Sequence, residues 1–180
     1  MLCILLLLTG CTRGGGSVER ALALRKTLVE RNGCSFDADI TADYGDNVYV
    51  FSMECTTDKE GNLTFCVTEP ETIAGISGKI SDNGGAITFD DKVFAFQTIA
   101  DGQITPVTGP WLFIKTLRSG YLNGCAKTDT GLEISIDDSY AEDALHLNVW
   151  TDADGTPTGC EIFWQGRRIL SIAVKEFSYL

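Results

Sequence analysis

Residues 35–44 read Ser-Phe-Asp-Ala-Asp-Ile-Thr-Ala-Asp-Tyr, and the organisation of the whole chain can be worked out from this stretch. Apolar side chains occupy every second position from 36 to 44, and the positions between them hold serine, threonine or aspartate. A period of two residues is typical of a β-strand that has one buried and one solvated face. We therefore expect a strand with an apolar inner face and an acidic outer face.

Short segments with strand character follow this first strand. Val48 to Thr56 forms the second expected strand and is apolar on both faces in its first half. A turn at 58–62 leads to the alternating segment 63–68, which Pro70 ends. Connections of hairpin length predict an antiparallel meander. Further strands are expected at 76–80, 86–89, 92–96, 125–128, 132–136, 145–151, 158–164 and 169–177.

Two segments have helical spacing instead. Apolar residues recur every three to four positions in 18–31, and Asn32-Gly33 is a suitable end for this helix. The segment 111–122 follows Pro110, which fits the first helical position, and we expect Gly124 to close it. About ten short antiparallel strands must curl or close. The fold class is therefore α+β, with helices that cover an end of the curved sheet or line its concave face.

The N-terminus resembles a bacterial lipoprotein signal. An apolar run from Ile4 to Leu8 continues into Thr9-Gly10-Cys11, and no lysine or arginine precedes it. This resemblance implies cleavage before Cys11 and attachment of a diacylglycerol to its sulfur. The run is too short for a membrane-spanning helix, which needs about 20 apolar residues. An ordinary signal peptide or an N-terminal strand are the alternatives.

These features divide the chain into a signal peptide at 1–10, a glycine-containing tether at 11–17 and one domain at 18–180. We expect an exported monomer, anchored at the outer side of the cell membrane through the lipid on Cys11. The net charge of −11 argues against nucleic acid as a partner and against a polybasic grip on the membrane. The covalent lipid would therefore supply the anchor.

Seven cysteines are present, and Cys3 and Cys11 belong to the signal and the lipid site. Cys55 and Cys66 flank the turn at 58–61, and a turn centred between 60 and 61 places them opposite each other. Cross-strand Cβ atoms lie about 4.5–5.5 Å apart, which is near the disulfide range. We expect a Cys55–Cys66 disulfide, with two buried thiols as the alternative. A Cys125–Cys160 pair is also possible.

The side-chain inventory predicts a protein without catalysis, metal or cofactor. The single histidine, His146, lies on a polar strand face, and no base is placed beside a serine or cysteine nucleophile. Asp137-Asp138 and Asp90-Asp91 are neighbours in turns, where carboxylates diverge. Asp152 and Asp154 match only part of a calcium-binding loop. A hydrolase with diffuse acidic chemistry is thus the least favoured class.

The order of elements resembles the Lol lipoprotein-carrier fold, that of the periplasmic carrier and its outer-membrane receptor. Lipoproteins of single-membrane bacteria that share the fold resemble this chain even more. The resemblance rests on the lipoprotein signal, a leading helix and several strand motifs. These motifs are Phe36 to Thr41, Glu60 to Phe65 with Thr68 to Glu71, Ile73 to Ile76, and Glu161 to Gly166 with Ile172 to Val174. It implies a half-open antiparallel barrel over helices, with an apolar hollow that holds acyl chains in the transport members.

Alternation and the helical pattern together give a set of candidate ligand-binding residues on the concave face. They are Phe36, Ile40, Phe65, Trp111, Ile162, Trp164 and Ile172. The first hypothesis is a non-catalytic lipoprotein that binds an apolar ligand, such as an acyl chain, a lipid or a lipidated partner. The second is an adaptor with a filled core, which binds another envelope, sporulation or germination protein.

Overall fold

The computed structural model describes residues 15–89, 92–93 and 98–180. Cys11 and the expected signal peptide lie outside these residues. Helix α1 (Gly15–Glu30) leads into β1 (Cys34–Asp43), β2 (Val48–Thr57) and β3 (Leu63–Glu69). The next strands are β4 (Ser77–Ser81), β5 (Gly84–Phe89) and β6 (Lys92–Val93). A short 3₁₀ turn, η1 (Pro106–Thr108), precedes helix α2 (Gly109–Ser119). Strands β7 (Tyr121–Lys127), β8 (Leu132–Asp137), β9 (His146–Thr151), β10 (Pro157–Trp164) and β11 (Arg167–Tyr179) complete the chain.

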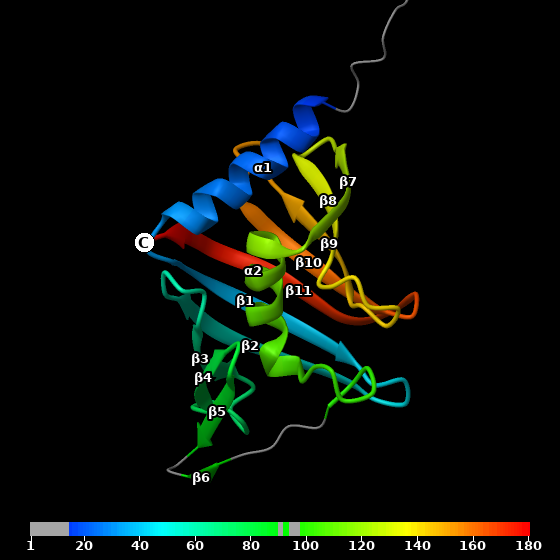
Figure 1. The fold of residues 1–180 in the computed structure, drawn as a ribbon. Coiled ribbons are helices and arrows are strands. Elements are labelled where there is room, and N and C mark those ends of the chain that lie inside the picture. The colour runs from blue at the N-terminus through cyan, green and yellow to red at the C-terminus, as the bar shows by residue number, and fades with distance from the viewer. Residues whose placement is uncertain (1–14, 90–91, 94–97) are drawn as a thin grey trace, which may run out of the picture.

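The strands form a single antiparallel sheet in the order β6-β5-β4-β3-β2-β1-β11-β10-β9-β8-β7. The first and last long strands are neighbours in the middle of the sheet, with Ile40 opposite Ile172. The sheet curves around α1 and α2 without closing, and both helices lie on its concave side (Figure 1). The predicted α+β, half-open architecture is confirmed.

Strand β1 has the alternation expected from its sequence. Its residues are buried and half-buried in turn along the whole strand, and Ala38, Ile40 and Ala42 are fully buried. The aspartates of the outer face bond to neighbouring strands: Asp39 accepts a hydrogen bond from Ser52 and forms an ion pair with Lys175. This ion pair and the hydrogen bonds lower the pKa of the Asp39 carboxyl.

One boundary of each helix differs by three residues from the one predicted. Residues 15–17 belong to α1, so the expected tether is helical over its last residues. Helix α2 ends at Ser119 rather than at 122, because the next residue, Gly120, is extended and tightly packed. A Cβ on Gly120 would lie 2.6 Å from Cγ2 of Thr116 and 2.7 Å from Cγ2 of Ile136. The helix therefore ends well before Gly124, and β7 begins correspondingly early.

Candidate functional site

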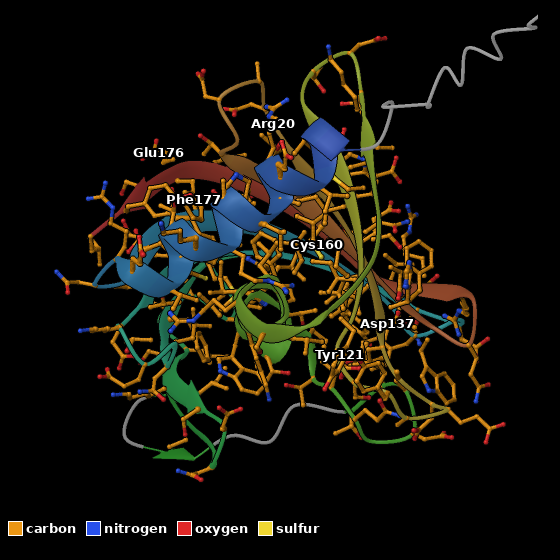
Figure 2. All side chains as sticks on the ribbon, turned by 45° about the horizontal axis from the view of Figure 1, so that its top comes forward. Arg20, Tyr121, Asp137, Cys160, Glu176 and Phe177 are labelled. Atoms are coloured by element: carbon orange, nitrogen blue, oxygen red, sulfur yellow. The ribbon has the colours of Figure 1, made fainter. Side chains whose placement is uncertain are left out.

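The predicted concave-face residues lie together, but in a packed core. Five of the seven are at most 2% exposed: Phe36, Ile40, Phe65, Ile162 and Ile172. Trp111 and Trp164 are half-buried and pack against this core. Figure 2 shows side chains filling the layer between the helices and the sheet, with Cys160 inside it. These side chains are therefore part of the core, and Phe36, Ile162 and Ile172 lie against α2.

Helix α2 occupies the centre of the hollow. A Cβ on Gly109, its first residue, would lie 3.0 Å from Cδ1 of Leu170 and 3.4 Å from Cδ1 of Ile172. Phe113, one turn further, is fully buried and meets Phe36 edge to face, with ring centroids 6.2 Å apart. The helix backbone thus lies directly on the side chains that were expected to line a ligand pocket.

Two arginines hold the helices against each other. The Arg25 guanidinium of α1 donates to the carbonyl oxygens of Leu117 and Gly120, at 2.9 and 2.8 Å, at the end of α2. The Arg118 guanidinium of α2 donates to the carbonyl oxygen of Leu28, at 3.2 Å, near the end of α1. The carbonyls at helix C-termini lack partners within their own helix and carry partial negative charge. Each helix therefore satisfies the C-terminal carbonyls of the other, which fixes both over the sheet.

One cavity between the helices and the sheet is very small. It has a volume of about 10 Å³ and lies between α1, α2, β7 and β8. Its walls include Leu22, Leu117 and Ile134. A cavity of this size holds about one water molecule at most. An acyl chain does not fit there unless a helix moves.

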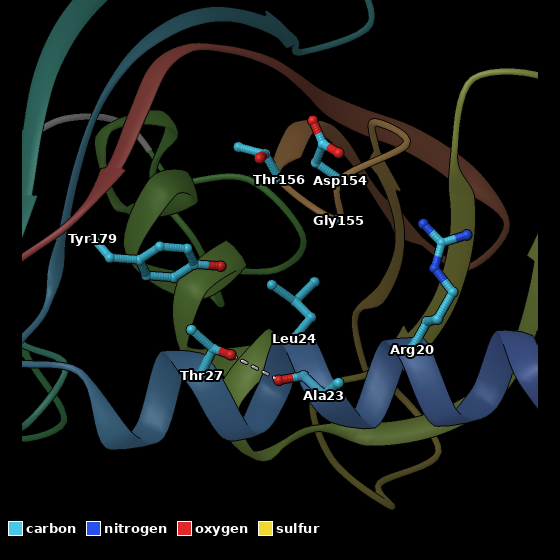
Figure 3. A pocket seen from close by; sticks show the side chains of 8 residues that line it. All are labelled: Arg20, Ala23, Leu24, Thr27, Asp154, Gly155, Thr156 and Tyr179. Atoms are coloured by element: carbon cyan, nitrogen blue, oxygen red, sulfur yellow. Dashed lines mark hydrogen bonds between the residues drawn. The ribbon is translucent and has the colours of Figure 1, made fainter.

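A larger recess lies between α1 and the turn that joins β9 to β10 (Figure 3). It has a volume of about 240 Å³, with Leu24 from α1 and Tyr179 from β11 among its walls. The Arg20 guanidinium crosses to this turn and donates to the carbonyl oxygen of Ala153 at 2.7 Å. The carboxylate of Asp152 accepts backbone N–H groups of Asp154 and Thr156, so it organises the turn.

Trp164 borders another hollow, at the opposite mouth of the sheet. This hollow has a volume of about 490 Å³, and Ile99 and Ile169 are among its apolar walls. The Asp43 carboxylate and the Arg167 guanidinium form an ion pair of 2.8 Å at its rim. The indole Nε1 of Trp164 is buried and has no hydrogen-bond partner in the described part of the chain.

Sequence reasoning missed a polar cluster on the outer face of β8 and β9. Nδ1 of His146 lies 2.7 Å from a carboxylate oxygen of Asp137, and Nε2 lies 3.3 Å from Oγ of Ser135. Oδ1 of Asn148 lies 3.1 Å from the same Nε2. The antiparallel register places Asp137 opposite His146 and Ser135 opposite Asn148. The order serine, histidine and aspartate is that of a hydrolytic triad.

The surroundings of Ser135 do not complete a hydrolytic site. A triad acts with N–H donors aimed at the developing oxyanion. Strand β8 is paired on both sides, by β7 and β9, so the ladders use its backbone donors around Ser135. The cluster has the geometry of a cross-strand hydrogen-bond network on the outer sheet face, where His146 and Asn148 border an open hollow of about 400 Å³. In residues 15–89, 92–93 and 98–180, no group of three or more His, Cys, Asp or Glu side chains could hold a metal ion.

The prediction of a Cys55–Cys66 disulfide is wrong. Cys55 lies opposite Phe65, and Cys66 lies opposite Glu54. The Asp58 carboxylate accepts the backbone and side-chain N–H groups of Asn62, which closes the turn one residue away from the expected register. A shift of one residue moves a side chain to the other face of a sheet. Cys55 is buried, Cys66 is half-buried on the opposite face, and the five cysteines of the described residues are free thiols.

The remaining feature is the outer edge of β2. Val48, Tyr49 and Val50 are 59%, 55% and 64% exposed. Their apolar character on both strand faces is visible in the sequence, but their exposure depends on where β3 stops pairing. The pairing of β2 with β3 covers only Ser52 to Thr57. The apolar half of β2 thus lies beyond the end of its neighbour.

No family model matches the chain, and no curated protein matches it either. Similar solved structures include an uncharacterized conserved protein from Thermus thermophilus, with a TM-score of 0.48, 12% identity and coverage of 91% of this chain and 88% of the other. A LolA superfamily protein from Nitrosomonas europaea has a TM-score of 0.44, 8% identity and coverage of 88% and 92%.

A putative outer membrane lipoprotein-sorting protein domain from Vibrio parahaemolyticus is also similar, with a TM-score of 0.46, 10% identity and coverage of 92% of both chains. One of these neighbours is named for the LolA superfamily, to which the sequence was compared above. With these TM-scores and identities, the likeness says nothing about ligand, partner or activity.

Proposed function

We propose that this chain is an exported, lipid-anchored, non-catalytic protein that binds another protein of the cell envelope. The observation that carries the proposal is the filled hollow, in which the protein's own helices cover the face that an apolar ligand would need. Pockets that bury small apolar ligands have volumes of about 300–1,000 Å³ and are lined mainly by apolar groups. The cavity between α1, α2, β7 and β8 has about 10 Å³, and the larger hollows, of about 240 and 490 Å³, lie beside the β9–β10 turn and the loop 98–102 rather than at the centre of the concave face. The outer surface is then the place where recognition occurs.

Anchoring through Cys11 is part of the proposal and is supported by the sequence around it. Leu8 and the small residues Thr9 and Gly10 precede this cysteine. Neither helix in the described part of the chain has the length and apolarity needed to span a bilayer. A diacylglycerol provides two acyl chains, and stable anchoring takes two such signals. The protein would therefore act beside a membrane surface.

The anchor is tested by mass spectrometry of the product isolated from its host. We expect the chain to begin at Cys11 and to carry a diacylglyceryl group on the sulfur. The Cys11→Ser variant should move from the membrane fraction to the soluble fraction, because the thioether can no longer form. An unmodified Cys11 in the native product, or a retained residue 1–10 segment, would contradict the anchor.

The filled hollow is tested with a fluorescent fatty acid and the purified protein freed of bound lipid. We expect no saturable binding, because α2 lies on Ile172 and Leu170 and the cavity beneath the helices has about 10 Å³. The larger hollow beside Trp164 is tested by the Trp164→Asp variant. Trp164→Asp and Tyr140→Asp, the second on an 84% exposed side chain, serve as matched variants. Stoichiometric binding that Trp164→Asp abolishes and Tyr140→Asp preserves, with both variants folded, would favour the apolar-ligand function instead.

A further inference from the structure

An exposed apolar run forms one side of the β1–β2 hairpin. Val48, Tyr49 and Val50 are each more than half exposed, and in the described part of the chain no other large apolar side chains are exposed in direct succession. Single exposed apolar residues are ordinary, whereas a contiguous group marks an interaction surface. The Tyr49 ring contacts Tyr44 edge to face at 5.4 Å, which fixes one end of the run.

Within the residues that the structure describes, the backbone of this run has an open hydrogen-bonding edge. The N–H of Tyr44 donates to the carbonyl of Asn47 at 2.9 Å, so these two residues form a hydrogen-bonded pair. Bonded and non-bonded pairs alternate along an antiparallel ladder. The next bonded pair along the ladder is therefore Ala42 with Tyr49, and Val48 and Val50 belong to non-bonded pairs. The N–H and C=O groups of Val48 and Val50 thus point away from β1. Strand β3 reaches only Ser52, so it does not cover them.

The two ends of the sheet differ from this edge. At one end, β6 consists of two residues, Lys92 and Val93. At the other end, α1 packs against β7, and the Cys125 thiol donates to the carbonyl of Ser17 at 3.2 Å. Short strands and covering elements are the usual means by which proteins protect sheet edges. The segment Val48–Phe51 has apolar side chains and an open edge instead.

A groove for a side chain lies next to the open edge. Val50 and Phe51 form one wall, and the turn after β3, with Pro70 and Ala74, forms the other. Its volume is about 460 Å³, and Ser52 and Thr68 add polar groups to it. A strand added beside β2 would place alternate side chains in this groove, because successive side chains point to opposite faces.

The charge around the groove selects the partner. Glu69 and Glu71 form no ion pair in the described part of the chain. The Lys175 ammonium interacts electrostatically with Glu69, but it is itself paired with Asp39. Glu69 and Glu71 line the groove itself. The chain as a whole has a net charge of −11. Electrostatic complementarity therefore favours a basic partner segment and disfavours an acidic one.

We propose that the edge of β2 at Val48–Phe51 binds an extended basic segment of a partner protein as an added strand, with apolar side chains alternating with lysine or arginine. This inference rests on the proposed function, since it names the surface and the chemistry of its protein partner. Strand addition combines backbone hydrogen bonds for affinity with side-chain pockets for specificity. Here Val48 and Val50 supply the backbone groups, and the groove beside Pro70 supplies the pocket.

The test uses the full chain and a fluorescein-labelled peptide of alternating lysine and valine, with fluorescence anisotropy as the readout. Val50→Pro removes an N–H on the open side and leaves the β1 ladder intact, because proline is tolerated where that N–H faces away from a neighbour. We expect this variant to bind about tenfold more weakly. Val48→Ser should bind a few-fold more weakly, whereas the matched Val29→Ser, on an exposed valine of α1, should bind as the parent does.

Two further arms separate strand addition from charge attraction. The same peptide, N-methylated at alternate residues, should bind as weakly as the Val50→Pro variant does, and this arm replaces Val50→Pro if that variant does not fold. A peptide with three lysines followed by three valines has the same charge and should bind more weakly. The proposal is overturned if the N-methylated or the block peptide binds as tightly as the alternating one.

A photo-crosslinking residue in the host distinguishes failure of this inference from failure of the proposed function. We expect placement at Tyr49 to give an adduct that maps to an extended basic segment and that excess alternating peptide suppresses. Placement at Tyr140 is the control and should give none. If adducts form only from Tyr140, the β2 edge is not the binding surface, but the proposal that the protein binds an envelope protein stands. Saturable fatty-acid binding that Trp164→Asp abolishes would overturn the partner function itself.

Discussion

Phe113→Ala is expected to lower the free energy of unfolding by about 3–5 kcal/mol, measured by urea denaturation. Phe113 is fully buried at the centre of α2 and stacks edge to face on Phe36. Its removal loses apolar contacts and leaves a cavity that the sheet and α2 fill only in part. The free energy of unfolding of a domain is about 5–15 kcal/mol, so this single substitution would remove a large part of the stability.

A control on the same helix separates this core effect from helix propensity. Trp111 is half-buried and its ring lies under the Lys115 ammonium at 4.6 Å. Trp111→Ala removes a larger side chain in the same element but should destabilise less than Phe113→Ala. Equal losses in the two variants would show that α2 is not the filler of the hollow, and the case for a protein partner would weaken with it.

Gly131→Ala is expected to lower the free energy of unfolding by about 2–3 kcal/mol, again by urea denaturation. A Cβ at this position would lie 2.0 Å from the carbonyl oxygen of Thr151 and 2.3 Å from that of Asp152. Both are backbone atoms at the end of β9, so no side-chain rotation relieves the clash. The β7–β8 turn or the β9 end must therefore move.

Gly124→Ala is the matched control in the adjacent strand. A Cβ on Gly124 would meet only Cβ of Ser135, at 4.0 Å, which is an ordinary contact. We expect a change within about 0.5 kcal/mol, as for most substitutions away from tightly packed features. If Gly131→Ala were as stable as Gly124→Ala, the close approach of β9 to the β7–β8 turn would be wrong.

The stability predictions and the functional proposal depend on the same packing. Helix α2 fills the hollow through Phe113, and the Arg25 and Arg118 guanidinium groups hold α1 and α2 together through carbonyls at the helix ends. With the concave face closed in this way, Val48 and Val50 are apolar and exposed, and their backbone groups have no strand partner in the described part of the chain. Such an edge is suited to bind an extended segment of another protein.

Several features were predictable because they depend on neighbours in sequence. The alternation around Ile40 determined which face of β1 is apolar. The helical spacing in 18–31 predicted α1, but of its apolar residues Ala21, Leu24 and Leu28 are buried whereas Leu22 and Val29 are exposed. The candidate residues Phe36, Phe65 and Ile162 were placed on the correct face for the same reason. Local periodicity does not report how much space remains between two faces.

The register errors have a different origin. Cys55 faces Cys66 only if the turn has the expected register, and a shift of one residue separates them. The hydrogen bonds between Asp58 and Asn62 fix the register in which they are apart. The meeting of Ser135, Asp137 and His146 likewise depends on the alignment of two strands across a loop. A shift of one position in either hairpin would separate these groups, so no pattern within one strand predicts them.

The amino-acid sequence by itself determined an antiparallel meander with two helices and the apolar face of the alternating strands such as β1, because periodicity is a local property of the chain. Only the tertiary structure decided that α1 and α2 fill the hollow, that Cys55 and Cys66 point apart, and that β2 extends beyond β3. These outcomes depend on the packing volume, the strand register and the relative lengths of neighbouring strands. Such quantities arise only when segments far apart in sequence meet in one core.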